Sequence, residues 1–493
     1  MARFAMDGTT SILAQEHLWV PGGGLSVNPD LGEVGSFLNF VAPPWATTGF
    51  ACRLTVAGAP VRASGYCWLP GEFQSEGLLP TEVRVSSVLS PIVAQRGLIE
   101  AIRVHNPTAQ PARLTLALAL AGEFADVPKN KMDLRRRDAP GPVRGGQPRQ
   151  VGRRAMAARP GDARRDDRDG RPGRSARRFR PAGAGAGRRG MDGGDHARPR
   201  GARTFSLVVT VGEATAASAL RGAHVADAAR GIAANRRQWA QRIEDLYRRV
   251  PTLSSSSREL VDFYDRSLLS YLVGRWDGPD FAAQPYFPTS GLDGGAFCLY
   301  AWDYSYTAML NPLVHPESDR AIIRLLLEAG LFHNYAALPF DGKPSGPWYA
   351  YNHYAITQMI YYYVLHTGDR GFLAERVNGR TVLEWAWAHA VYLDDLAAPV
   401  ALIDYGTNEN LLELHRTDAY LHFVPSPNAE RCWSYRAVDE MAGWAGVKPF
   451  GLARRADELA AVIQQKLWGP AGALVCRPRW QRSPATLLLD PGF

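Results

Sequence analysis

Residues 401–436 read ALIDYGTNENLLELHRTDAYLHFVPSPNAERCWSYR, a mixture of acids, amides and aromatic residues that follows no regular period. Three of the acids are Asp404, Glu409 and Glu413. An irregular polar segment of this kind runs over the surface and often carries function. We therefore expect this segment to line a cleft.

The chemistry of this segment suits a sugar. A pyranose presents hydroxyl groups around its rim and C–H groups on its faces, so its site needs amides, carboxylates and flat aromatic rings. Two carboxylates are required if the glycosidic bond is to be cut. Because residues 401–436 supply all three kinds of side chain, they predict a carbohydrate site.

Amphipathic patterns around this segment predict helices. Apolar residues recur at three- and four-residue spacing, which is typical of helices with one buried face. The expected helices span 228–250, 257–276, 319–336, 354–368, 372–393, 428–446 and 452–469. Long loops on one side of such a helical domain and short loops on the other would leave one face with a cleft.

The first 125 residues follow a different pattern. Short runs rich in Val, Leu and Thr alternate with Gly, Pro and Asn turn signals, which predicts β-strands. The expected strands lie within 50–58, 81–95, 97–108 and 112–124, and 203–214 adds one more. An antiparallel β-sandwich is the natural packing for them.

The segment 133–203 carries the excess of positive over negative charge. It holds 21 Arg, 8 Asp and no Lys, a local balance of +13 in a chain whose formal charge is +8. The rest of the chain is therefore mildly acidic, at −5. Net charge alone thus gives little reason to expect binding to nucleic acid or to an anionic membrane.

Three interpretations of this Arg-rich segment stay open. Its scarcity of apolar residues is typical of a disordered insertion, and its Arg and Gly content is also found in nucleic-acid-binding arms. Recurrent Arg, Gly, Ala, Pro and Asp are in addition what GC-rich coding DNA yields in a wrong frame. We favour this last interpretation, because the strand pattern breaks off near residue 132 and resumes near 203, and we rank nucleic-acid binding last.

Several other classes of protein fit the sequence poorly. The five cysteines show neither a CxxC pair nor metal-ligand spacing, so no disulfide framework or zinc site is indicated. No run of about 18 apolar residues occurs, and the N-terminus lacks a basic region followed by an apolar one. We expect a cytoplasmic protein with reduced thiols, no metal, no cofactor and no membrane partner.

Four segments together resemble the six-hairpin, or (α/α)6-barrel, glycosidases, in particular glycoside hydrolase family 63 and the mannosylglycerate-hydrolase-like enzymes. They are WDYSYTAMLNPLVHPE (302–317), GPWYAYNHYAITQ (346–358), DYGTNENLLE (404–413) and PSPNAERCW (425–433). The resemblance covers roughly residues 222–470. It implies hydrolysis of α-glucosides or α-mannosides by an inverting mechanism with two carboxylates.

The resemblance also implies a multi-domain fold, with an N-terminal antiparallel β-sandwich followed by an (α/α)6 toroid. The expected parts are a sandwich at 1–132 and 203–221, the Arg-rich segment at 133–202, a linker helix at 222–251, a partial toroid at 252–470 and an irregular tail at 471–493.

Related enzymes carry an acid motif of the form Glu-Ser-Gly-X-Asp, and Gly406 can be aligned with the glycine of this motif. Asp404 then stands where the family has Glu, and Asn408 stands where the family has its catalytic Asp. An amide cannot donate a catalytic proton, so the resemblance implies that either Glu409 or Asp404 takes the role of general acid.

Candidate sugar contacts share polar or aromatic side chains near the resembling segments. They are Trp302, Asp303, Trp348, Tyr349, Asn352, His353, Asn408, Glu413, Asn428 and Trp433. Asp303 could instead cap a helix that begins near Ser305, and Asn352 and His353 could cap the helix that follows them. Trp348 and Tyr349 are stacking candidates, because a ring in a loop has no core to fill.

The helical pattern ceases near residue 470, after about seven of the twelve helices of such a toroid. We therefore expect a truncated toroid whose general base lies beyond the last residue. Two functions stay open: a hydrolase of oligosaccharides or small glycosides, and a catalytically dead carbohydrate-binding fragment. The pattern indicates no particular oligomeric state.

Overall fold

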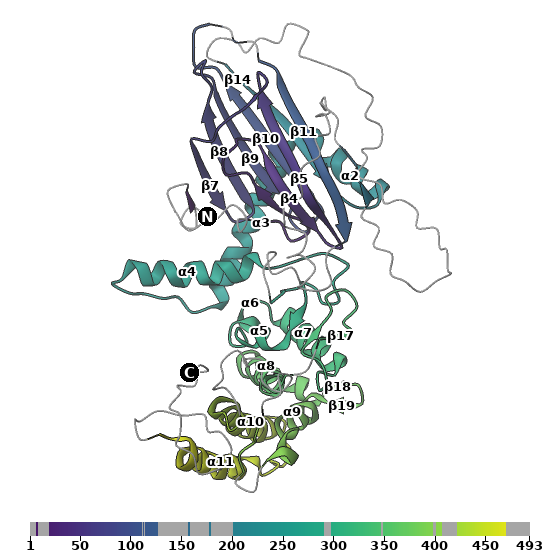
Figure 1. The fold of residues 1–493 in the computed structure, drawn as a ribbon, viewed down its shortest axis with the longest axis vertical. Coiled ribbons are helices and arrows are strands. Elements are labelled where there is room, and N and C mark those ends of the chain that lie inside the picture. Colours follow the sequence, from purple (N-terminus) through teal and green to yellow (C-terminus); the bar gives the residue numbers. More distant parts are fainter. Residues whose placement is uncertain are drawn as a thin grey trace, which may run out of the picture. The chain divides into compact units, whose positions relative to one another are not determined.

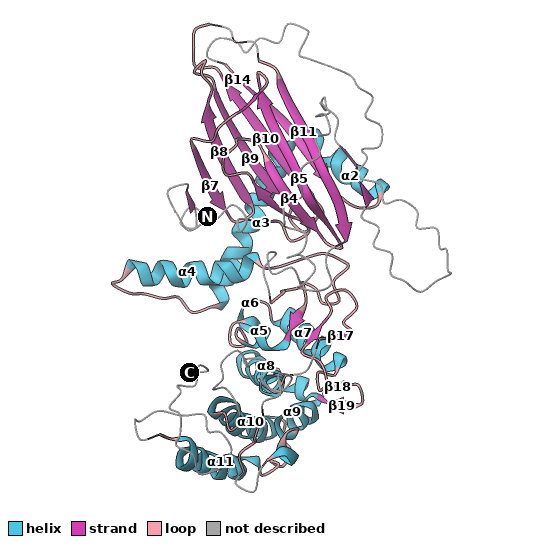
Figure 2. Cartoon of the chain, in the orientation of Figure 1, coloured by secondary structure: helices cyan, strands magenta, loops and turns pink. Residues whose placement is uncertain are grey.

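The computed structural model describes residues 19–110, 112, 114–126, 201–289, 297–346, 349–397, 401–406 and 422–469, together with two-residue strands at 6–7, 156–157 and 177–178. The chain divides into two compact units. The first ends at Asp280 and the second begins at Phe281 (Figure 1). Strands predominate in the first unit and helices in the second (Figure 2).

Two seven-stranded sheets form the core of the first unit. The first sheet has the order β1 (Met6–Asp7), β7 (Gly65–Leu69), β8 (Glu72–Leu78), β9 (Arg84–Pro91), β10 (Gly97–His105), β14 (Ala202–Thr210) and β12 (Met156–Ala157). The second has the order β13 (Arg177–Arg178), β11 (Leu116–Asp126), β5 (Trp45–Val56), β4 (Phe37–Ala42), β3 (Ser26–Pro29) and β2 (Val20–Pro21), and β6 (Ala59–Pro60) pairs with β5.

The pairing is antiparallel throughout the described strands, except that β12 runs parallel to β14. The strand expected at 203–214 joins β10 with a continuous register from Gly97 opposite Thr210 to His105 opposite Ala202. The two sheets pack face to face through a core that includes Leu54 of β5 and Ile102 of β10. This is the antiparallel sandwich expected from the sequence, with one parallel edge.

Alternation along β10 explains why helices cover the outer face of its sheet. Ile102 points into the sandwich, whereas Ile99, three residues earlier, packs against Ile232 of α3 (Ala228–Arg249). Leu220 of α2 (Ala214–Val225) packs against the same cluster. Successive residues of a strand point to opposite faces, so β10 contributes to both layers.

The second unit is mainly helical. Its helices are α5 (Ala301–Ser305), α6 (Asn311–Val314), α7 (Pro316–Ala329), α8 (Tyr351–Thr367), η4 (Arg370–Ala374), α9 (Val382–Val391), η5 (Asp394–Leu396), α10 (Pro425–Trp444) and α11 (Leu452–Leu467). Short strands form a three-stranded sheet of β15 (Leu299–Tyr300), β16 (Ala336–Ala337) and β17 (Pro344–Ser345), and a hairpin of β18 (Arg376–Val377) and β19 (Arg380–Thr381). The first unit also contains α4 (Arg258–Val273).

Two expected helices have wrong bounds. The helix expected at 319–336 ends at Ala329, where Gly330 takes a left-handed φ of 62°, and Ala336 lies in β16. The other expected helix is wrong at its start. The pattern predicts a helix from 372 to 393, but α9 begins only at Val382, after the β18–β19 hairpin. Asn378 and Gly379 form the turn, with φ of 47° and 82°. Asn-Gly is the preferred pair for such a tight hairpin turn, and this local preference overrides the helical pattern.

Helices α8, α9 and α10 pack against one another, and α11 packs on α10. Successive helices alternate in direction, so the start of α8, the end of α9 and the start of α10 lie at one end of the layer. The connections 330–350 and 392–424 occur at this end, whereas the shorter connections 368–381 and 445–451 lie at the other end. The helical layer therefore has one end at which long loops gather.

Candidate functional site

A small cavity lies at the end of the helical layer where the long loops gather. The start of α8, the end of α9 and the start of α10 all contribute to its wall, together with residues that follow α9 in the chain. Its lining residues are Ala350, His353, Tyr354, His389, Ala390, Leu393, Tyr405, Pro427, Glu430, Arg431 and Ser434. Its volume of about 20 Å³ is enough for about one water molecule.

Helical spacing explains the contribution of α10 to this wall. Pro427, Glu430, Arg431 and Ser434 are three, four and seven residues apart and so share one helix face. Arg431 is 8% exposed, and its Nε has no hydrogen-bond partner among the described residues. The α10 part of the wall therefore contains an acid, an arginine and a serine.

Two histidines form another part of the wall. The Nδ1 atoms of His353 and His389 lie 3.0 Å apart, so one ring donates a hydrogen bond and the other accepts it. The ring of Phe332 stacks on His389 with centroids 4.2 Å apart. Burial lowers the pKa of His353 well below its usual value, and burial likewise lowers the pKa of His389, to about 3. Both rings are therefore uncharged at neutral pH.

The acid loop, defined as residues 401–422, is described at its two ends. The backbone N–H of Tyr405 donates to the carbonyl of His422 over 2.9 Å, and the N–H of His422 donates to the carbonyl of Gly406 over 2.9 Å. Asp404 Oδ1 lies 2.8 Å from both the Gly406 nitrogen and the His422 Nδ1. These contacts close the base of the loop.

Asp404 is thus near the cavity without lining it. Its neighbour Tyr405 lines the cavity and is 1% exposed. The other acid candidate, Glu409, lies outside the described residues, as do Asn408, Glu413 and Trp348.

Of the three other polar candidates on α8 and α10, one lines the cavity and two are fully buried. His353 lines the cavity. Asn352 is fully buried and donates to the carbonyl of Asn334 over 2.8 Å, and its Oδ1 has no partner among the described residues. Asn428 is also fully buried, and backbone groups of Ile403 and Val424 bind its amide.

Aromatic candidates lie on a neighbouring surface of α5, α8 and α10. The ring of Trp302 lies 4.7 Å from that of Tyr351, and the ring of Trp433 lies 5.3 Å from that of Tyr354. Tyr354 joins this surface to the cavity, because it also lines the latter. Tyr349 instead contacts Tyr335, with centroids 5.5 Å apart.

Asp303 lies inside α5 and is exposed, rather than capping a later helix. The wall residues Glu430 and Arg431 were not singled out from the sequence. Their three- and four-residue spacing from Pro427 and Ser434 was a usable signal, because it places all four on one face of an expected helix.

No group of three or more His, Cys, Asp or Glu side chains in the described part of the chain is arranged to hold a metal ion. Cys52, Cys67, Cys298 and Cys432 are free thiols. None of the described helices has both the length and the apolar character that crossing a membrane requires. The Arg-rich segment lies almost entirely outside the described residues.

No protein-family model matches this chain, and no curated protein matches it. Among solved structures, the chain is similar to a bacterial glucoamylase complexed with acarbose, at 8% identity and a TM-score of 0.49, over 93% of this chain and 68% of that one. It is also similar to a glycosyl hydrolase of family 92, at 10% identity and a TM-score of 0.31, over 93% of this chain and 63% of that one. The resemblance to family 63 stays a prediction.

Proposed function

We propose that the chain is a glycoside hydrolase of the six-hairpin type that acts on α-glucosides or α-mannosides. The observation that carries this proposal is the position of the acid loop. Hydrogen bonds between its two ends close its base, and Tyr405 within that base lines the cavity. The acid and the serine of the wall and the rings of the neighbouring surface would supply contacts that a sugar requires.

The proposed reaction inverts the anomeric carbon. A protonated carboxyl of the acid loop donates its proton to the leaving oxygen, while a second carboxylate activates a water on the opposite face of the sugar. We propose Glu409 or Asp404 as the proton donor. Asp404 Oδ1 is engaged at the base of the loop, but its Oδ2 accepts no hydrogen bond from a described residue.

The sugar contacts are proposed from the candidates with suitable chemistry. His353 and Glu430 would bind hydroxyls from the wall, and Trp302 and Trp433 would stack on sugar faces. Trp348, Tyr349, Asn352, Asn408, Glu413 and Asp303 stay proposed contacts on sequence grounds.

Single replacement of the two acid candidates tests the proposal. We expect either Glu409→Gln or Asp404→Asn to lower kcat for aryl α-glucosides or α-mannosides by at least about 100-fold, because general acid catalysis contributes about 10²–10⁴-fold. Glu76→Gln, which changes an exposed carboxyl of β8, is the control and should leave kcat unchanged. Full activity in both acid variants would refute the assignment.

Carbohydrate binding without turnover is the second candidate function. It is favoured by Asn408, which stands where related enzymes have their acid, and by the engaged Oδ1 of Asp404. In that case an oligosaccharide would raise the melting temperature, since a ligand that binds only the folded state stabilises it, and no product would appear.

A further inference from the structure

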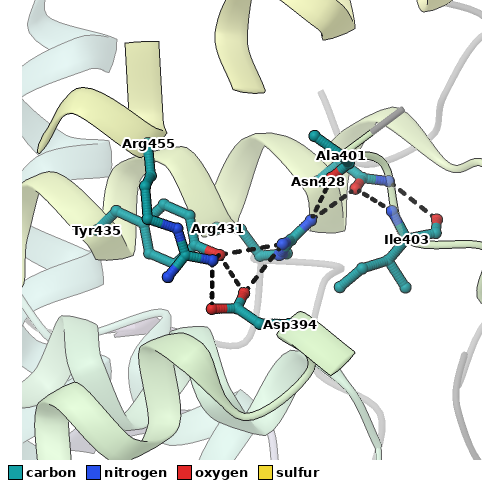
Figure 3. A network of polar contacts seen from close by, with 7 residues as sticks. All are labelled: Asp394, Ala401, Ile403, Asn428, Arg431, Tyr435 and Arg455. Carbon is teal, nitrogen blue, oxygen red and sulfur yellow. Dashed lines mark hydrogen bonds and ion pairs between the residues drawn. The ribbon is translucent and has the colours of Figure 1, made fainter. Parts of the chain in front are cut away.

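Arg431 makes hydrogen bonds in two directions from the second turn of α10 (Figure 3). Its NH2 group donates to Asp394 Oδ1 and to the Tyr435 hydroxyl, each over 3.0 Å. Its NH1 group donates to the carbonyl of Ala401 over 3.2 Å and to Asn428 Oδ1 over 3.3 Å. The guanidinium thus connects η5, which follows α9, to the start of the acid loop.

Asn428 extends this connection by two residues along the loop, from Ala401 to Ile403. Its Oδ1 accepts the backbone N–H of Ile403 over 3.0 Å, and its Nδ2 donates to the carbonyl of Val424 over 2.8 Å. Both Asn428 and Ile403 are fully buried. A buried backbone group that loses its partner costs about 1–3 kcal/mol, so these bonds hold the segment firmly.

The backbone of the loop base needs such support. Ala401 and His422 adopt φ of 65° and 62°, in the left-handed region that residues other than glycine rarely occupy. Each such residue costs about 1–2 kcal/mol and persists only where its surroundings determine it. Arg431 binds the carbonyl of Ala401 itself, and His422 is paired with Asp404.

The other side of the network is anchored independently of Arg431. Asp394 also accepts a hydrogen bond from Arg455 of α11 over 2.6 Å, and the Tyr435 hydroxyl donates to it. Removing the Arg431 charge would therefore leave Asp394 paired with Arg455. This matters because a buried charge left unpaired is strongly destabilising.

We infer that Arg431 is a positioning residue that fixes the described base of the acid loop, residues 401–406 and His422, against η5 and α10. The inference rests on the proposed function, since Asp404, one of the two proposed proton donors, belongs to the base that Arg431 fixes. Arg431 acts on the donor through Ala401 and Asn428 and takes no part in the proton transfer.

Three variants on one helix test this inference. Arg431→Met removes the guanidinium but keeps an unbranched aliphatic side chain. Arg431→Lys keeps the positive charge but loses the two NH groups with which the guanidinium binds Asp394 and Ala401 at the same time. Arg436→Met is the matched control, because Arg436 lies on the exposed face of α10 and pairs with Asp457 of α11. Each variant is compared with the parent chain by steady-state kinetics and by hydrogen exchange of the Ile403 and Tyr405 amides.

We expect Arg431→Met and Arg431→Lys to lower kcat by about 100-fold with KM within about threefold, because a displacement of about 1 Å can cost that factor. The two amides should exchange at least about tenfold faster in both variants and at the parent rate in Arg436→Met. Parent-like kcat and exchange in Arg431→Met would overturn the inference.

The same experiment separates this inference from the proposed function. If the folded parent chain hydrolyses no glycoside, the proposed function fails, and the exchange data alone decide whether Arg431 holds the loop. If the parent is active and kcat is the same in Arg431→Met and Arg436→Met, the positioning role fails while the hydrolase stands.

Discussion

Glu100 is the most unusual single residue of the first unit. Its side chain is fully buried in the sandwich, and neither carboxyl oxygen has a hydrogen-bond partner among the described residues. Burial raises its pKa from 4.5 to about 8, so the side chain is largely neutral at pH 7. Alternation along β10 places Glu100 on the same face as Ile102, which points into the sandwich.

The raised pKa of Glu100 predicts a pH dependence of stability. Between pH 4.5 and about 8 the folded state holds the proton while the unfolded state has released it, so the free energy of unfolding falls as the pH rises. The slope from this group reaches at most about 1.4 kcal/mol per pH unit. Glu100→Leu should therefore raise the melting temperature at pH 8 more than at pH 5.

Melting of the parent chain, Glu100→Leu and Glu76→Gln at pH 5, 6, 7 and 8 would check this prediction. Glu76 is an exposed acid of the neighbouring strand β8, so its replacement should leave the pH slope unchanged. If the parent and Glu100→Leu show the same slope, the carboxyl of Glu100 does not stay protonated in the folded state.

At the scale of elements, α3 docks on the sandwich by a close approach of Trp239 to Gly71. A Cβ on Gly71 would lie 1.9 Å from the Trp239 Nε1, and Gly71 has φ of +72°. Trp239 is 1% exposed, so its ring has little room to move. We expect Gly71→Ala to lower the free energy of unfolding by about 3 kcal/mol, from overpacking and backbone strain together.

Gly58→Ala separates these two contributions. Gly58 has φ of +83°, but nothing lies within 4 Å of the position that a Cβ would take. Its replacement should cost only the backbone strain, about 1 kcal/mol. Denaturant unfolding followed by tryptophan fluorescence would measure both variants, and equal losses would show that Trp239 does not restrict Gly71.

The sequence predicted those helices and strands whose apolar residues recur regularly and whose ends carry clear turn signals. The strands that became β5, β9, β10, β11 and β14 were expected because apolar runs there end at clear turn signals. The helix expected from 372 was wrong at its start because Asn378 and Gly379 favour a hairpin. Contacts between distant residues, such as Arg431 with Ala401 or His353 with His389, could not be predicted, because they depend on how the helices pack.

At the scale of the whole molecule, the described elements follow the expected order, in which antiparallel sheets precede a helical region. The exact domain boundaries, the closure of the toroid and the identity of the acid stay predictions. Of the two acid candidates, the structure describes Asp404 at the base of the loop, while Glu409 lies outside the described residues.

The most direct test is proton NMR of the first sugar released from aryl α-glucosides and aryl α-mannosides by the purified, folded chain. An inverting two-carboxylate mechanism predicts that the β-anomer appears first and that the α-anomer follows by mutarotation. Initial release of the α-anomer, or no release from any substrate of the panel by a chain that melts cooperatively, would contradict the proposed hydrolase.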